Sequence, residues 1–181
     1  MRVLQPWPLP RFIIMSDKLS RPPYTVFPNI TGERITLRQI GASDMKDLVE
    51  ISFYDAVQAT SEQEAAAMQD KINQDYLDGN SIHWGIADNL TDKIVGTCGY
   101  YRGFDKEAGE LGCVLLPAYR GKGFMTAALL LAIEFGLNQI GLTRIWAITS
   151  QDNPGAIKLL EGLKFIKVAD LEDQDVEYEL K

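Results

Sequence analysis

The chain has 181 residues, a formal net charge of −7, 46% hydrophobic residues and 24% charged residues, which is the composition of an ordinary soluble protein of one domain. The acidic balance argues against nucleic-acid binding. No apolar run reaches the roughly 18 residues of a membrane span, and no secretory signal is recognised, so we expect a cytoplasmic protein without a membrane partner. With one histidine and no usual ligand spacing, no metal site is expected.

The N-terminal stretch is rich in proline. Six of the eight prolines lie in residues 1–28, and proline donates no backbone hydrogen bond. We therefore expect an extended arm over residues 1–30 and a single domain over residues 31–181. Met15 is a second candidate for the natural first residue, and the sequence leaves open whether residues 1–14 belong to the native protein.

The first half of the domain begins with a strand and two helices. Alternation over residues 34–38 predicts a half-buried strand, and residues 43–44 predict the cap of a helix that reaches about Val57. Ser61 with Glu64 three residues later is a capping box, which opens a second, largely polar helix. That composition predicts a surface position beside a substrate cleft.

Two further strands follow this helix, which is predicted to end at Gly79. Residues 82–87 and 94–102 have strand patterns joined by a polar turn. The two cysteines, Cys98 and Cys113, both fall in predicted strands, where we expect buried free thiols.

An anion-binding turn dominates the second half. Residues 111–116 form an apolar run typical of a buried strand, Pro117 ends it, and the basic turn Arg120-Gly-Lys-Gly123 leads into a long apolar helix. Glycines let backbone N–H groups approach an anion closely, and a helix N-terminus adds free donors and partial positive charge. We therefore predict a phosphate-bearing cofactor at residues 120–126.

The remaining elements complete a mixed sheet. The helix stops near residues 138–141, and residues 143–150 predict a strand parallel to the strand before the glycine turn. Asn153-Pro154 is a helix start with Asn as cap and Pro in the first turn. Residues 165–168 and 176–180 predict closing strands. This order predicts an α/β fold, with a mixed sheet of six to seven strands and about four helices on both faces.

The glycine turn matches neither common nucleotide motif. The Walker pattern is absent. A dinucleotide fingerprint has three glycines immediately after a strand. Here residues 117–119 separate the strand from the turn, and Thr126 stands at the position of the third glycine. In contrast, Arg120-x-x-Gly123-x-Met125 after a strand resembles the pyrophosphate loop, Q/R-x-x-G-x-G/A, of the GNAT superfamily of N-acetyltransferases.

The resemblance extends over roughly residues 31–180. Residues 110–123 are similar to the fourth strand and loop of the branch that includes the ribosomal-protein N-terminal acetyltransferases. Residues 153–165 (NPGAIKLLEGLKF) look like the same branch's N-x-x-(S/A)-x-x-L-x-E-K-x-G-F segment. The resemblance implies a GNAT-like fold, in which the parallel strands 4 and 5 are splayed, and acetyl-CoA as the cosubstrate.

The resemblance also implies a set of cofactor contacts. Backbone N–H groups near Val114 and Leu115 would bind the pantetheine arm or the oxyanion. Asn153 and Ala156 would approach the cofactor from the next helix. The phosphate-binding residues would be Arg120, Gly121, Lys122, Gly123, Phe124, Met125 and Thr126.

Glu110 and Asn153 are the predicted catalytic residues. Glu110 begins the cofactor strand, where a splayed pair of strands would open the site, so we assign it as the general base, directly or through water. Asn153 is a helix cap that we also expect to touch the cofactor. We assign His83 a structural role.

Four positions depart from the family pattern, one in the loop and three in or just after the helix that follows Asn153. Met125 stands where the family prefers Gly or Ala. Leu160 occupies the place of a tyrosine that protonates the leaving thiolate in many relatives, which leaves the general acid unassigned. Ala156 replaces a serine, and Lys164 replaces a common glycine.

The predicted function is acetyl transfer from acetyl-CoA to a primary amine. At pH 7 about 10 to 17% of a protein α-amine is neutral, against about 0.04% of a lysine side chain. An α-amine therefore depends less on a general base to remove its proton. A non-catalytic acyl-CoA sensor and a dinucleotide-binding fragment are the alternatives. The sequence leaves open the acceptor and the oligomeric state, for which a homodimer is one option.

Overall fold

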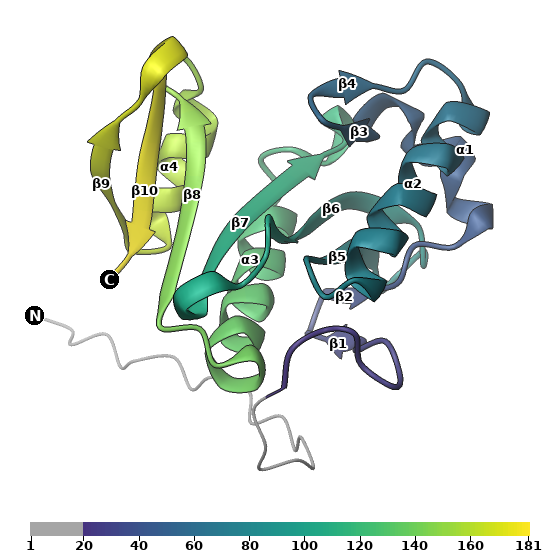
Figure 1. The fold of residues 1–181 in the computed structure, drawn as a ribbon. Coiled ribbons are helices and arrows are strands. Elements are labelled where there is room, and N and C mark those ends of the chain that lie inside the picture. Colours follow the sequence, from purple (N-terminus) through teal and green to yellow (C-terminus); the bar gives the residue numbers. More distant parts are fainter. Residues whose placement is uncertain (1–19) are drawn as a thin grey trace, which may run out of the picture.

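A mixed β-sheet of eight strands runs through the computed structural model, which describes residues 20–181 (Figure 1). Its spatial order is β1-β2-β5-β6-β7-β8-β10-β9, and β3 with β4 forms a separate hairpin. The strands are β1 (Ile30–Thr31), β2 (Ile35–Arg38), β3 (Phe53–Tyr54), β4 (Val57–Gln58), β5 (Ile82–Asp88), β6 (Ile94–Tyr101), β7 (Ala108–Leu115), β8 (Arg144–Ser150), β9 (Phe165–Asp170) and β10 (Asp175–Leu180).

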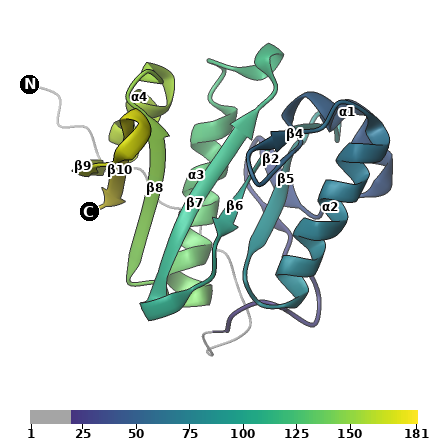
Figure 2. The same ribbon diagram turned by 45° about the horizontal axis from the view of Figure 1, so that its top comes forward.

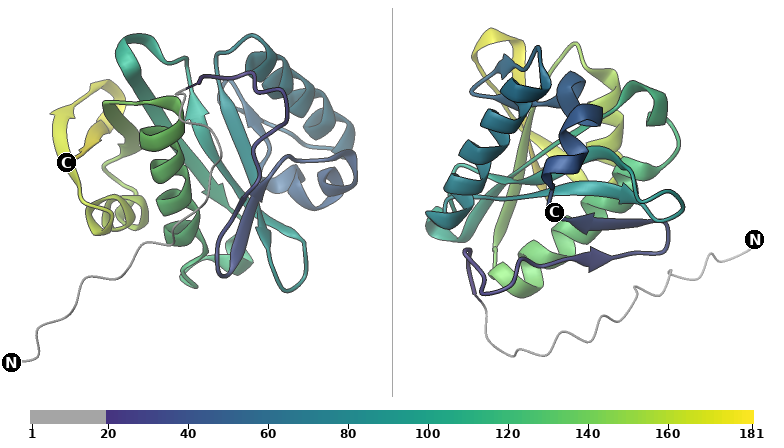
Figure 3. Two further views of the ribbon diagram at one scale, coloured as in Figure 1. Left: turned by 90° about the horizontal axis from the view of Figure 1, so that it is seen from below. Right: turned by 90° about the vertical axis from the view of Figure 1, so that its right-hand side faces the viewer.

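Helices cover both faces of this sheet, as the sequence predicts. Within the described residues they are α1 (Met45–Leu48), α2 (Glu62–Leu77), α3 (Phe124–Phe135) and α4 (Pro154–Gly162). The expected mixed α/β fold is confirmed, but the sheet has eight strands rather than six to seven. The extra strand is the two-residue β1, which pairs antiparallel with β2 at the sheet edge (Figure 3, right, purple arrows).

The predicted helix from residue 43 to about Val57 is wrong. Helix α1 is a single turn flanked by short 3₁₀ segments, and the hairpin β3–β4 follows it. The hairpin turn places Asp55 and Ala56 at positive φ, 49° and 62°, which no helix accommodates. Aromatic residues at 53 and 54 also favour a strand over a helix.

Helix α2 begins and ends as predicted. Ser61 Oγ accepts a hydrogen bond from the Glu64 N–H at 3.2 Å. In a capping box, the Glu64 carboxylate would accept from the N–H of the cap residue, Ser61. It instead accepts bonds at 2.7 Å from the N–H and the hydroxyl of Thr60. Gly79 ends the segment with a φ of 79°, a left-handed conformation that glycine adopts freely.

Two hydrophobic clusters lie on opposite faces of the sheet. The larger cluster packs α3 against the sheet, and the Tyr100 hydroxyl donates to the Ala132 carbonyl within it at 2.9 Å. The smaller cluster lies under α1 and α2 and is called the α1–α2 cluster below. Its buried members are Ile40, Met45, Leu48, Ile51, Ala59, Ala65, Ala87 and Ile94.

The described part of the proline-rich stretch is packed onto the domain. Trp84 donates from its indole nitrogen to the Pro28 carbonyl at 2.8 Å. Tyr24 and Phe27 place their rings against Phe135 and Trp84. Residues 1–19, which include Met15, lie outside the described residues. Over residues 20–181, no helix combines the length and the apolar character that crossing a membrane requires.

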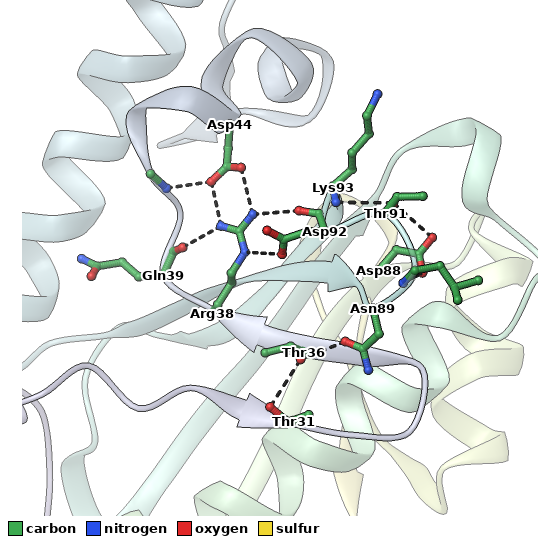
Figure 4. A network of polar contacts seen from close by, with 12 residues as sticks. Thr31, Thr36, Arg38, Gln39, Asp44, Asp88, Asn89, Thr91, Asp92 and Lys93 are labelled. Atoms are coloured by element: carbon green, nitrogen blue, oxygen red, sulfur yellow. Dashed lines mark hydrogen bonds and ion pairs between the residues drawn. The ribbon is translucent and has the colours of Figure 1, made fainter.

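An arginine network ties the end of β2 to the start of α1 (Figure 4). Arg38 donates to both carboxylate oxygens of Asp44, at 2.8 and 3.0 Å, and to the Asp92 carbonyl at 3.1 Å. The Gly41 N–H also donates to Asp44, at 2.8 Å. Burial by itself raises the pKa of Asp44, but the bonds from Arg38 and Gly41 outweigh it and leave this pKa below its ordinary value. The network fixes α1 over the sheet.

Replacing Asp44 tests this network. We expect Asp44→Asn to lower the free energy of unfolding at pH 7 by about 1.5 to 3 kcal/mol, because it removes a charge-assisted pair with little solvent access. A carboxyl with a depressed native pKa stabilises fully above its unfolded pKa of about 3.9, and the contribution disappears as pH falls through the native pKa. Urea unfolding at pH 7 and pH 3 measures the effect.

The matched control is Asp47→Asn, an exposed carboxylate on α1. It should change the unfolding free energy little at either pH. An equal loss in the two variants would contradict the role of the network.

Candidate functional site

The two parallel strands at the centre of the sheet separate after only three residue pairs. Ala108, Gly109 and Glu110 of β7 pair with residues 144–146 of β8. Beyond Glu110, β7 continues to residue 115 and β8 to residue 150, but the two strands no longer pair with each other. Figure 2 shows the gap between the two strands, with α3 behind it. The expected splay of the fourth and fifth core strands is confirmed. The gap begins at Glu110, the predicted general base.

The register of β7 decides which backbone groups face this gap. The Leu116 N–H donates to the Val95 carbonyl of the other neighbouring strand at 2.9 Å. Alternate residues of an antiparallel ladder bond to the same neighbour, so the backbone of Val114 also faces β6, and that of Leu115 and Cys113 faces the gap. Of the expected donor pair, only Leu115 therefore presents its N–H to a ligand there. The second N–H that faces the gap belongs to Cys113, not to Val114 as expected.

The glycine turn has the backbone shape of an anion site. Gly121 and Gly123 have φ of 71° and 83°, and Gly123 is the N-cap of α3. The first bond that closes the helix runs from the Ala127 N–H to the Gly123 carbonyl. The N–H groups of residues 124–126 consequently have no partner in the helix.

The side chains of this turn divide into two groups. Arg120, Lys122 and Thr126 are exposed, whereas Phe124 and Met125 are buried in the core against the sheet. The last two residues can therefore contribute to an anion site only through their backbone. Met125 lies within the first turn of α3, although the family prefers Gly or Ala at this position.

Arg34 is a part of this site that the sequence analysis missed. Its Nη1 donates to the Lys122 carbonyl at 3.0 Å, although 88 residues separate the two in the chain. Its guanidinium lies over the Phe124 ring, 5.0 Å from the centroid. Arg34 thus holds the glycine turn from the β1–β2 edge and adds a third cation to it. Only the tertiary structure brings it there.

Asn153 caps α4 on the far side of the gap. Its Oδ1 accepts a bond from the Ala156 N–H at 3.1 Å, which confirms the predicted helix cap. Leu160 on the same helix is buried in the core, so this position offers no proton donor. Lys164, where the family has glycine, adopts a φ of 73°, which explains the family preference at this position.

A cavity of about 680 Å³ lies between the α1–α2 side and the face of β5, β6 and β7. Glu110 and Val114 both line it, and four strand residues span about 13 Å. The cavity thus follows the same stretch of β7 whose other edge faces the gap. A ligand in the gap and a ligand in the cavity would meet along this strand.

Glu110 lies at the start of this stretch, and its side chain is only 11% exposed. Arg102 Nη1 donates to both of its carboxylate oxygens, at 2.7 and 2.6 Å. Burial raises the pKa of Glu110, and the charge of Arg102 opposes this without cancelling it. The structure therefore gives the predicted base a carboxyl with a raised pKa, held in place by one arginine.

Tyr101 is a second residue that the sequence analysis missed. It pairs with Glu110 across the β6–β7 ladder, and it lines the cavity. A Cβ built on Gly112 would lie 2.3 Å from the Tyr101 ring, so the ring lies directly over that glycine. The ring is therefore directed along β7, away from Glu110 and toward Val114. Among residues 20–181, its hydroxyl has no hydrogen-bond partner.

Two polar atoms at the cavity wall are buried without a partner in the described part of the chain: Ser81 Oγ and His83 Nδ1. Burial lowers the pKa of His83 to about 4, so its imidazole is neutral near pH 7. The ring also lies against that of Tyr101, with centroids 5.3 Å apart and the ring planes tilted by 53°. A neutral imidazole can accept one hydrogen bond from a ligand.

The two cysteines differ in their surroundings. Cys98 is buried as expected, but the expectation for Cys113 is wrong, because its side chain is exposed beside the gap. The protein around it nevertheless limits its hydration enough to raise its pKa to about 11. Over residues 20–181, no three His, Cys, Asp or Glu side chains cluster in a way that would hold a metal ion.

Comparison with known proteins identifies the family. A family model described as an acetyltransferase (GNAT) domain matches residues 34–166. The chain is 32% identical over 152 residues to the uncharacterized N-acetyltransferase p20 of Bacillus licheniformis, a match that covers 79% of this chain and 85% of that protein. It is 27% identical over 150 residues to the uncharacterized N-acetyltransferase YoaA of Bacillus subtilis, covering 78% and 85%. The chain belongs to the GNAT acetyltransferase family.

Solved structures agree with this fold. A Vibrio cholerae protein described as a candidate ribosomal-protein-serine acetyltransferase superposes with a TM-score of 0.75 at 19% identity, covering 84% of this chain and 96% of that one. A mutant of the spermidine N-acetyltransferase SpeG, also from Vibrio cholerae, superposes with a TM-score of 0.68 at 19% identity, covering 82% and 94%.

Family membership establishes the class of reaction. The protein is an acyltransferase that moves an acetyl group to an amine, and enzymes of this family use acetyl-CoA as the cosubstrate. The dinucleotide-binding alternative and the non-catalytic alternative lose their support. The family alone does not assign roles to the residues of this chain.

The role of Arg34 in the glycine turn is directly testable. We expect Arg34→Gln to weaken CoA binding about 10- to 100-fold, the equivalent of one charge-assisted hydrogen bond of about 1.5 to 3 kcal/mol. Binding of pantetheine, which has no pyrophosphate, should not change. Titration calorimetry with both ligands measures the difference.

Arg21→Gln is the control, since it removes the same charge from an exposed residue outside the turn. If Arg34→Gln and Arg21→Gln weaken CoA binding equally, the effect is one of net charge and the specific role is refuted.

Proposed function

We propose that the protein acetylates a primary α-amine held in the cavity, with acetyl-CoA bound in the gap between β7 and β8. One observation carries this proposal: β7 has the gap along one edge and the cavity along one face, over the same residues. A thioester in the gap and an amine in the cavity would therefore meet at β7. The glycine turn lies just beyond the end of this strand.

The cofactor would be bound by backbone groups and by cations at one end. The pyrophosphate would sit on the free N–H groups of residues 124–126, with Arg120 and Lys122 nearby. Such donors, together with the helix dipole, suit a diphosphate. The pantetheine arm would run back along β7 and bond to the N–H of Leu115. From the far side of the gap, Asn153 and Ala156 would bound the thiol end.

Glu110 would accept the proton of the amine, directly or through a water molecule. Its raised pKa brings it closer to neutral pH, where a general base is more effective. An α-amine also needs less help than a lysine, because about 10 to 17% of it is already neutral at pH 7. Amines are the acceptors named for structural neighbours, spermidine among them.

The chemical step is a direct transfer. The amine nitrogen attacks the thioester carbonyl carbon, and the π electron pair moves to the carbonyl oxygen, where the Cys113 N–H can stabilise it. The tetrahedral adduct collapses, the C–S bond breaks, and its electron pair leaves with sulfur. Glu110 takes the proton that the nitrogen loses. The products are the N-acetylated amine and CoA.

Tyr101 would protonate the departing thiolate, in place of the residue missing at Leu160. The ring is directed along β7 toward the stretch that faces the gap. A thiolate is poorly solvated there, as the raised pKa of Cys113 indicates. Burial also raises the pKa of Tyr101 above its ordinary value, so the phenol would release its proton only to a thiolate made more basic by the same lack of hydration. The phenolate would regain its proton from solvent.

The function is tested by thiol release from acetyl-CoA in the presence of an N-terminal peptide. We expect Glu110→Gln to lower kcat by about 10² to 10⁴-fold, as the loss of a general base does, with little change in CoA affinity. Arg102→Gln should move the acidic limb of the pH–rate profile to higher pH, because the charge that lowers the pKa of Glu110 is gone.

Two outcomes would contradict the proposal. Unchanged rates in Glu110→Gln would remove the carboxylate from the chemistry. No turnover by the wild type with any amine, despite CoA binding, would remove the proposed function of the cavity.

The role of Tyr101 makes a separate prediction. Tyr101→Phe should lower kcat with acetyl-CoA by about 10²-fold, because the thiolate then leaves unprotonated. With acetyl-seleno-CoA the loss should nearly vanish, since a selenolate is a better leaving group that needs no proton. Equal losses with both donors would show that the hydroxyl does not act on the leaving group. Thermal melting of the variant checks that the fold is intact.

A further inference from the structure

The cavity has two ends of different chemistry. One end is apolar and belongs to the α1–α2 cluster: Leu48, Ile51, Ala65, Met68 and Val114 line it. The other end carries hydrogen-bonding groups: Asp75, Asn80, Ser81, His83 and Glu110 line it. An acceptor that fills the cavity must match both.

The reacting amine must lie between these ends. Val114 stands at the apolar end and Glu110 at the polar end, about 13 Å apart along β7. The edge of β7 that faces the gap includes Cys113, which lies between Glu110 and Val114, so an acetyl group delivered beside Cys113 arrives between the two ends. The acceptor therefore extends from its amine in two directions.

The carboxylates of the polar end are already engaged. Glu110 accepts two bonds from Arg102, and Asp75 accepts a bond from the Tyr54 hydroxyl at 3.2 Å. Asp55 of the β3–β4 turn also lines the cavity, where it is exposed to solvent. A second ammonium group at the polar end would have to compete with Arg102 for Glu110 or remain hydrated beside Asp55 and Asp75. At the apolar end it would be desolvated without a partner, which is costly for a charge. The apolar end therefore disfavours polyamines.

The free groups of the polar end suit a neutral polar ligand instead. Ser81 Oγ and His83 Nδ1 are buried without a partner in residues 20–181. The imidazole is neutral near pH 7, so Nδ1 can accept an N–H, and the serine hydroxyl can donate to a carbonyl. An amide offers both an N–H and a carbonyl. A buried polar atom that lacks a partner in the free protein gains most from such a ligand.

We propose that the acceptor is a peptide N-terminus whose first side chain is apolar. The side chain would fill the apolar end at Met68 and Val114, and the first peptide bond would lie at Ser81 and His83. The α-amine would stand between them, opposite the thioester. This inference rests on the proposed function of the cavity and adds the specificity of the acceptor.

The test measures kcat/KM for acetyl transfer from acetyl-CoA to matched acceptors. Pentapeptides that begin with Met or Leu should exceed the same peptides that begin with Ser or Asp by about 10-fold or more, the discrimination that an apolar pocket achieves. They should exceed spermidine as well. Isoamylamine, which has the leucine side chain but no amide, should react worse than leucine N-methylamide.

Variants at the apolar end provide the control. Met68 is only partly buried, so its replacement should leave the fold intact. Met68→Gln should reduce the preference for Met over Ser at the first position several-fold, and Met68→Leu should retain it. Thermal melting and CoA affinity should match those of the wild type in both.

The outcomes separate the two proposals. A preference for spermidine, or equal rates for Met and Ser peptides, would overturn the acceptor assignment and leave amine acetylation standing. CoA binding without turnover of any acceptor would overturn the proposed function itself.

Discussion

The site depends on the short pairing between β7 and β8. A parallel pair that ends after Glu110 leaves the backbone of Cys113 and Leu115 facing a gap instead of another strand, and Arg120 Nε donates to the Leu115 carbonyl there at 3.3 Å. Backbone groups inside a protein need partners, and an extended amide-containing arm supplies the same kind of partner as a strand does. The opening that interrupts the sheet is thus also the place where a pantetheine arm would complete it.

Charge is organised around this opening. The chain carries a net charge of −7, yet three cations gather at the glycine turn: Arg34, Arg120 and Lys122. The N-terminus of α3 adds partial positive charge at the same place. On the cavity side, Arg102 offsets the charge of Glu110, and the remaining wall combines apolar side chains with two carboxylates, Asp55 and Asp75. An anionic cofactor and an amine with an apolar group would therefore approach from different sides.

The departures from the family pattern are local and have local consequences. Leu160 packs in the core and cannot donate a proton, whereas Tyr101 lies over Gly112 on the other side of β7. Lys164 occupies the left-handed conformation that suits glycine. These changes leave the sheet, the gap and the glycine turn intact, because the strand register and the positive φ angles of the two loop glycines determine those features.

The sequence alone determined the class of protein. Local signals sufficed for it: the glycine turn after a strand, the Asn153 cap and the alternating strands predict the family and the mixed sheet, and both are confirmed. The helix predicted up to Val57 was wrong, because aromatic residues and a tight turn outweighed its cap. Only the tertiary structure placed Arg34 on the glycine turn, set the Tyr101 ring over Gly112, and brought Met68 and Ser81 into the lining of one cavity. Strand register and packing between elements decide such arrangements, and the periodicity within one element carries no information about them.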